Sequence, residues 1–317
     1  MIVKGSYQKY SDLKDQYGFI SASDLKGCRT PLEFITKYRK KKKEGKPEFV
    51  VGSAFHSLIL EPECFYQEYG CFYDSARPFQ DKDYRTKENK EYKDNFFAQA
   101  QAKGVTLITK EDYDNLFRMK EAVYSQLPIL PQILDFSKGM AEANIFCAVL
   151  INPETKTIEK FIKVNEYDEF KEYTIEKNYL RVAIKPDYFN AVKKIVADLK
   201  TTTDSEPMDF SKQLASYQYQ VQTSLYLDIL GNEFETEFEN FFFISVEKQS
   251  PYHSAIYDCD RALIEYGRFI YTQRLVKILE CFKTNHWPGM EIYSPYEKAK
   301  GIIPISLPKW AFVETKF

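Results

Sequence analysis

The chain has 317 residues, of which 44% are hydrophobic and 28% charged, and its formal net charge at pH 7 is −2. This composition is typical of a soluble globular protein with one large domain or two smaller ones. The net charge gives no overall basic field for nucleic acid, and no apolar run approaches the roughly 20 residues that cross a bilayer.

The six cysteines are scattered, and none forms a C-x-x-C pair. This spacing argues against a zinc ribbon, an iron–sulfur cluster and a disulfide framework. The first residues, "MIVKGSYQKYSDLKD", lack the apolar segment of a signal peptide. We therefore expect a cytoplasmic protein with reduced thiols and no membrane partner.

The first 136 residues are predicted to be mainly helical. Apolar side chains recur at helical spacing, and Ser21 or Ser23 is suited to cap the first helical segment. Pro62 should end the second segment and Gly104 the third. The predicted helical segments are 21–38, 49–63, 90–104 and 110–127.

A basic run lies between the first two of these segments. Residues 37–46, "KYRKKKKEGK", contain Lys40, Lys41, Lys42 and Lys43. Such a run is typical of a solvated loop, but it is also suited to contact a phosphate backbone. Both interpretations stay open from the sequence.

Strand patterns replace helical ones from Gly139 onward. Apolar and β-branched runs predict strands at 141–151, 179–189, 192–202, 238–249 and 253–259. Helical spacing predicts one helix over 209–230 and a long one over 260–285. This order favours a mixed sheet with helices against it and the N-terminal helices as one wall. We predict one compact domain, with a helical region over 1–136, a core over 137–317 and a charged insertion or hairpin over 152–178.

Charged residues interrupt two of the apolar runs. Asp187 follows a proline at the end of one run, and Asp198 and Lys200 lie within the strand "KKIVADLKTT". Burying an unpaired charge costs several kcal/mol, so such groups usually cluster or bind a metal. On adjacent strands both carboxylates can converge on one Mg²⁺, which prefers hard oxygen ligands. The Leu199 carbonyl would point to the same place.

Strand alternation puts Lys200 on the same face as Asp198. From there it could orient or deprotonate an attacking water, or stabilise a pentavalent phosphate. Thr201 begins the run "TTTD", which could donate hydroxyls to a phosphate or could simply end the strand.

The stretch "KPDYF…VADLK" resembles the Pro-Asp…(Asp/Glu)-x-Lys signature of the PD-(D/E)XK nuclease superfamily. Further stretches are similar to motifs of the RecE-type exonucleases and occur in the same order. They are "GSAFHSLILEPECF" (52–65), "AEANIF" (141–146), "YQYQVQTSLY" (217–226), "HWPG" and "LPKWA". The resemblance implies a restriction-endonuclease-like core in an α/β (α+β) fold.

The resemblance also implies roles at the matching positions. Asp187 and Asp198 would be the metal carboxylates, Lys200 the catalytic lysine and His56 an additional metal ligand. Further site residues implied in the same way are Glu142 at the metal, Gln222 supporting the site from its helix, and Tyr226 one turn further along that helix.

A Mg²⁺-dependent exonuclease follows as the expected activity, with Mn²⁺ able to substitute. The family implies digestion of linear double-stranded DNA from the 5′ end, leaving 3′ single-stranded tails for recombination in a phage or prophage. It also implies a homo-oligomeric ring and a single-strand annealing protein as partner. The alternatives are a structure-specific or helicase-associated nuclease of the same superfamily, and a DNA-binding module without activity.

Overall fold

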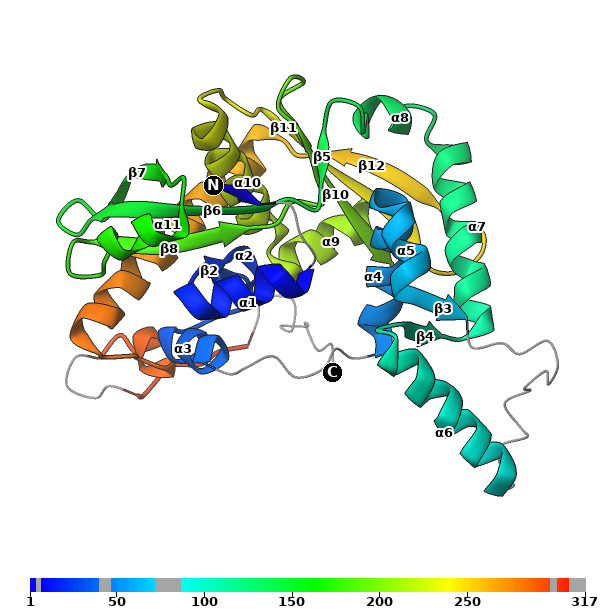
Figure 1. Ribbon diagram of the computed structural model, residues 1–317. Coiled ribbons are helices and arrows are strands. Elements are labelled where there is room, and N and C mark those ends of the chain that lie inside the picture. Colours follow the sequence, from blue (N-terminus) through cyan, green and yellow to red (C-terminus); the bar gives the residue numbers. More distant parts are fainter. Residues whose placement is uncertain (4–6, 40–46, 72–86, 297–300, 308–317) are drawn as a thin grey trace, which may run out of the picture.

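A computed structural model describes residues 1–3, 7–39, 47–71, 87–296 and 301–307 of the chain. Within these residues the strands form two five-stranded sheets and one two-stranded ladder, and helices pack against both larger sheets (Figure 1). The predicted class, a mixed sheet flanked by helices, is therefore confirmed, although the strands divide into two sheets where one was expected.

The described helices are α1 (Tyr7–Tyr17), α2 (Ala22–Leu25), α3 (Pro31–Arg39), α4 (Pro47–Leu60), α5 (Pro62–Glu68), α6 (Lys87–Ala102), α7 (Lys110–Gln126), α8 (Leu130–Ile133), α9 (Pro207–Tyr217), α10 (Tyr219–Phe234) and α11 (Arg261–Thr284), with 3₁₀ turns at Tyr167–Glu172 and Met290–Tyr293. The described strands are β1 (Ile2–Val3), β2 (Ile20–Ser21), β3 (Tyr69–Cys71), β4 (Thr106–Ile108), β5 (Met140–Ala141), β6 (Asn144–Asn152), β7 (Thr157–Lys163), β8 (Tyr179–Ile184), β9 (Tyr188–Asn190), β10 (Ile195–Thr202), β11 (Asn240–Glu247) and β12 (Ser254–Asp258).

The first sheet has the order β1-β6-β8-β2, with β7 also paired to β6. Side chains alternate along its central strand β6. Ile145, Cys147 and Val149 join the core that includes α10 and α11, whereas Phe146 and Ala148 join a smaller aromatic cluster beneath α1. Both faces of this strand are buried, which explains its continuous apolar sequence.

The second sheet has the order β12-β11-β10-β9-β5, and its central pair, β10 and β11, is parallel. Helices α4 and α7 cover one face of it, on the right in Figure 1. Ala197 and Leu199 point to that side, whereas Val196 points to the core shared with α10. Asp198 and Lys200 share the Val196 side by alternation, so they face α10.

The chain passes between the two sheets at two neighbouring places. β5 of the second sheet continues into β6 of the first, and β8 of the first sheet continues into β9 of the second. β5 pairs with β9 and β6 pairs with β8, and both pairs are antiparallel. At the bend, the backbone N–H of Glu142 donates to the carbonyl of Asp187 at 3.0 Å. Glu142 has φ 51°, a left-handed conformation that non-glycine residues adopt at some cost. Both acidic residues therefore lie where the two sheets meet.

Three features differ from the expectations. The strand that ends before Asp187 does not pair with the strand of Asp198; β9, which begins just after Asp187, pairs with β10 instead. The helix expected over 209–230 is broken at Gln218, whose φ of 54° separates α9 from α10. The N-terminal region also contains the short strands β1 to β4, of which β1 pairs with β6, β2 with β8, and β3 with β4.

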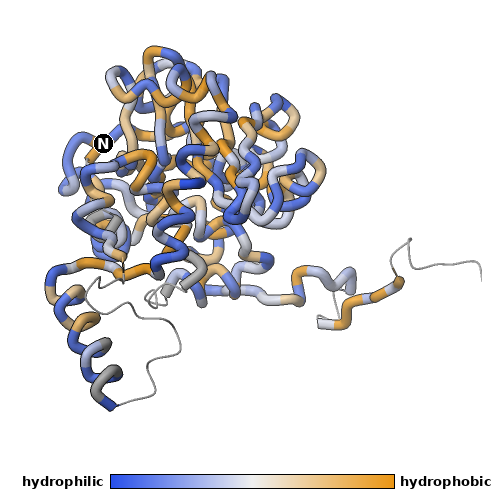
Figure 2. Tube along the Cα trace, turned by 90° about the vertical axis from the view of Figure 1, so that its right-hand side faces the viewer, coloured by the Kyte–Doolittle hydropathy of each residue, from blue (hydrophilic) through white to orange (hydrophobic). Residues whose placement is uncertain are grey.

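The segment 152–178 contains β7, which forms a hairpin with β6, and a 3₁₀ turn. Helix α6 stands away from the body in both views (Figures 1 and 2). No helix within the described ranges is long and apolar enough to span a membrane.

Candidate active site

Three potential metal ligands meet at the bend between the sheets. Among the described residues, one group of metal-binding type occurs: ligand atoms of His56, Glu142 and Asp187 all lie within 4.8 Å of one another. Helix α4 supplies His56, whose Nδ1 is 3.2 Å from an Asp187 carboxylate oxygen. One imidazole and two carboxylates are a donor set that fits a divalent cation.

Asp198 lies beside this group but is engaged differently. Its side chain is 1% exposed, and its carboxylate accepts hydrogen bonds from the Lys200 ammonium and from the Gln222 amide. Leu199 lies between Asp198 and Lys200 in the sequence, and its N–H donates to Asp187 Oδ2 at 2.7 Å. Strand β10 therefore positions both carboxylates, because it carries Asp198 and its backbone binds Asp187.

Charge and burial act in opposite directions on these groups. Burial alone raises the pKa of Asp187, but the His56 and Lys200 charges and the two hydrogen bonds from His56 and Leu199 bring it below its usual range. Burial and the nearby Asp187 charge raise the pKa of Asp198, against the effect of Lys200. The two carboxylates therefore differ in proton affinity, with Asp187 held ionised.

Two further lysines belong to the site, and motif reasoning missed both. Lys185 forms an ion pair with Glu142, and Lys26 donates to the Gln222 amide oxygen. Burial, followed by the Lys200 charge, lowers the pKa of Lys26 to about 8. A signal existed for Lys185, which is a charged residue at the end of the apolar run "YLRVAI" and directly precedes Pro186.

A cleft of about 730 Å³ opens at this group of residues, and Asp198 and Lys200 are not part of its lining. Its walls include Lys26, His56, Glu142, Asp187 and the ring of Tyr226, whose hydroxyl donates to the Lys185 carbonyl at 3.2 Å. The cleft is lined by carboxylates, an imidazole and ammonium groups, so it can hold both a cation and the phosphates that the cation would attract.

The structure thus brings together His56, Glu142, Asp187, Asp198, Leu199, Lys200, Gln222 and Tyr226. Thr201 lies elsewhere: it follows Lys200 on the opposite face of β10, and its hydroxyl is close to Gly52 of α4. The basic residues Lys40 to Lys43 fall outside the described residues.

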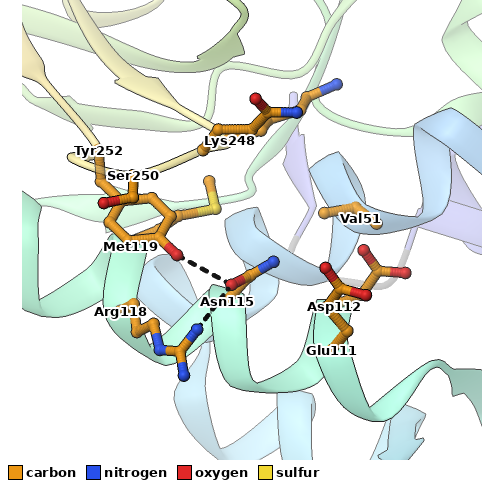
Figure 3. A pocket seen from close by; sticks show the side chains of 10 residues that line it. Val51, Glu111, Asp112, Asn115, Arg118, Met119, Lys248, Ser250 and Tyr252 are labelled. Atoms are coloured by element: carbon orange, nitrogen blue, oxygen red, sulfur yellow. Dashed lines mark hydrogen bonds between the residues drawn. The ribbon is translucent and has the colours of Figure 1, made fainter.

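A second hollow, of about 530 Å³, lies between α7 and the turn from β11 to β12 (Figure 3). None of the predicted site residues lines it. Its central amide oxygen, on Asn115, accepts hydrogen bonds from Tyr252 at 2.9 Å and Arg118 at 3.2 Å. Because these polar groups satisfy one another, we assign the chemistry to the cleft at the bend.

Comparison with known families agrees with this geometry. Residues 154–294 match the model of a family described as a PDDEXK-like domain of unknown function. This match to a PDDEXK-like domain confirms the superfamily predicted from the motifs. The match includes Asp187, Asp198, Lys200, Gln222 and most of the segment 152–178.

Among solved structures, a candidate exonuclease from Eubacterium rectale aligns with a TM-score of 0.53 and 12% identity, covering 96% of each chain. At this identity the likeness shows a shared fold. The structure of SSO0001 aligns with a TM-score of 0.30 and 10% identity over 89% of each chain. No curated protein matches the sequence.

Proposed function

We propose that the protein is a Mg²⁺-dependent exodeoxyribonuclease that hydrolyses one strand of linear double-stranded DNA from the 5′ end and leaves a 3′ single-stranded tail. The observation that carries the nuclease assignment is the group of His56, Glu142 and Asp187 next to the pair of Asp198 and Lys200. The direction and the need for an end rest on the resemblance to RecE-type exonucleases.

The chemistry follows from what each side chain can do. The chemistry that a divalent ion would supply here, when bound, is polarisation of the scissile phosphate and a lower pKa of bound water. His56, Glu142 and Asp187 would hold that ion, and the Lys200 ammonium would stabilise negative charge that develops on the phosphate. Gln222 donates to the Asp198 carboxylate and accepts from the Lys26 ammonium, so it fixes the positions of these two charged groups relative to each other.

The test compares Asp187→Asn with the wild type on end-labelled linear duplex and on a covalently closed circle, with Mg²⁺ or EDTA. Asparagine keeps an acceptor for the Leu199 N–H but removes the charge, so we expect cleavage of linear DNA to fall by about 100-fold or more. Asp114→Asn is the matched control, because Asp114 lies on α7 and pairs with Lys110.

Each outcome decides between the alternatives. Loss of the linear substrate alone, with the label at the 5′ end released first, supports the exonuclease. Cutting of the closed circle would instead indicate an endonuclease of the same superfamily. Binding of both substrates without cleavage would indicate a DNA-binding module without activity.

The proposed partners follow from the same resemblance. We propose a homo-oligomeric ring around DNA, a single-strand annealing protein as companion, and action in the cytoplasm of a bacterium that carries the phage or prophage. The exposed apolar side chains of residues 301–307, including Ile305 at 96% exposure, are suited to a contact between copies. Light scattering on the purified protein would show whether it is a multiple of 37.3 kDa.

A further inference from the structure

An exposed tyrosine lies at the end of a short aromatic stack that begins at the active site. Tyr217 is the last residue of α9 and is 60% exposed, yet its ring stacks on Tyr219, with centroids 5.6 Å apart and 22° between the planes. Side chains two apart on a continuous helix do not face each other. The left-handed residue Gln218 breaks the helix and allows this stack.

The break is held in place by neighbouring elements. The Gln218 side-chain oxygen accepts hydrogen bonds from Arg274 of α11 at 2.7 Å and from the Gly27 N–H at 3.3 Å. Two segments distant in sequence thus hold the turn between Tyr217 and Tyr219. The exposed ring is therefore presented by a fixed turn and not by a loose loop.

The inner end of the stack reaches the catalytic lysine. The Tyr219 ring lies 4.9 Å from the Lys200 ammonium and 5.1 Å from that of Lys26, and it packs on Phe243 of β11 at 5.4 Å. The stack therefore runs from the core, past two cations, to solvent. Such cation–ring contacts fix the inner ring in the field of the two ammonium groups.

This arrangement matches the chemistry of a nucleotide. Phosphates pair with ammonium groups, and an aromatic ring one step away offers a surface for the base that the phosphate carries. We propose that Tyr217 is a stacking platform for an unpaired nucleobase of the strand being cleaved, next to the scissile phosphate, with Tyr219 as its backing. The proposal rests on the proposed function, because it takes the cleft as the place of the scissile phosphate.

The test measures binding apart from cleavage. Fluorescently labelled duplexes with a short unpaired 5′ end, with or without one base removed to leave an abasic site, are bound in EDTA. Tyr217→Ala should weaken binding of the intact oligonucleotide about tenfold, the effect of losing one stacked base. It should leave the affinity for the abasic oligonucleotide unchanged, and Tyr217→Phe should retain the affinity for both.

A direct signal of stacking comes from 2-aminopurine at the same position, whose fluorescence should be quenched by the wild type and by Tyr217→Phe but not by Tyr217→Ala. Tyr124→Ala is the control, because Tyr124 is an exposed tyrosine on α7, which packs against the opposite face of the second sheet. We expect it to behave as wild type.

Two results would overturn the inference. The first is that wild type and Tyr217→Ala bind the intact oligonucleotide with equal affinity. The second is that Tyr217→Ala loses as much affinity for abasic DNA as for intact DNA, which would mean a structural role. Cleavage of end-labelled duplex by the wild type is measured in parallel. Absent cleavage with retained quenching would contradict the exonuclease proposal but not the stacking site.

Discussion

At the scale of single residues, the site consists of buried charged groups that stabilise one another. Asp198 is almost completely buried, and Lys200 is the ammonium that contacts it. Gln222 donates to the same carboxylate, and Leu199 between them is part of the core. Such a network is stable only while its members are present together, because each buried charge depends on its partner.

The Asp198–Lys200 pair should therefore behave non-additively. Lys200→Met leaves a buried carboxylate without its cation, and we expect the free energy of unfolding to fall by about 3 kcal/mol. Adding Asp198→Asn should recover part of that loss, because the unpaired charge is then removed. Urea unfolding of both single variants and the double variant, in metal-free buffer, gives the coupling energy. Strictly additive losses would contradict the pairing.

A buried thiol provides a pH test far from the metal ligands. Burial raises the pKa of Cys147 on β6 from 9.0 to about 12. The unfolded thiol loses its proton first, so stabilisation that is complete below pH 9 is lost progressively as the pH rises toward 12.

The free energy of unfolding should accordingly fall above pH 9, with up to about 1.4 kcal/mol per pH unit due to Cys147. Urea unfolding of the wild type and Cys147→Ala between about pH 8 and about pH 10 measures this contribution, because other titrating groups are shared. Parallel pH dependences for the two proteins would contradict the assignment.

At the scale of elements, the site depends on how closely two helices pack. Gly267 of α11 lies against α10, where an added Cβ would come within 2.1 Å of the Gln220 carbonyl oxygen and 2.2 Å of Ser224 Oγ. Ser224 also donates to the Ile264 carbonyl of α11 at 2.6 Å. The position of α10, and hence of Gln222, is set by this contact.

Gly267→Ala should push the two helices apart and lower the free energy of unfolding by about 3 kcal/mol. Gly52→Ala is a matched control on α4, because its Cβ would meet Thr201 Oγ1 at an ordinary 3.4 Å. We expect that variant to lie within about 1 kcal/mol of wild type, since alanine favours a helix. Thermal and urea unfolding compare the two, and equal effects would contradict the close packing.

Sequence patterns predicted the long elements well, because α7 and α11 have apolar residues at helical spacing and β6 and β10 are apolar and β-branched runs. They could not predict the division into two sheets, since periodicity shows which face of a strand is buried but not which strand it pairs with. The break at Gln218 also escaped, because neither glycine nor proline marks it. Within the site, motif order predicted the residues that now lie together, whereas Lys26 and Lys185 have no motif of their own.

At the scale of the whole molecule, the proposed metal ligands come from three separate parts. His56 belongs to a helix that covers the second sheet, and Glu142 and Asp187 lie at the two bends between the sheets. An ion bound by all three would connect these parts and would bind the folded chain only. Such binding raises stability by mass action.

Mn²⁺ or Mg²⁺ should therefore raise the melting temperature, and EDTA should reverse the change. At an ion concentration of about 100 times the dissociation constant, the expected gain in the free energy of unfolding is about 2.7 kcal/mol. Asp187→Asn should lose most of this response, and Asp114→Asn should keep it. A similar response in wild type and Asp187→Asn, followed by calorimetry, would place the ion elsewhere.

The left-handed backbone at Glu142 has one more implication. Glycine or asparagine would suit that conformation better, and a glutamate there costs the fold about 1 kcal/mol. The same residue contributes a carboxylate to the group with His56 and Asp187. A substitution that relieved the backbone would therefore also remove a negative charge from the place where the two sheets meet.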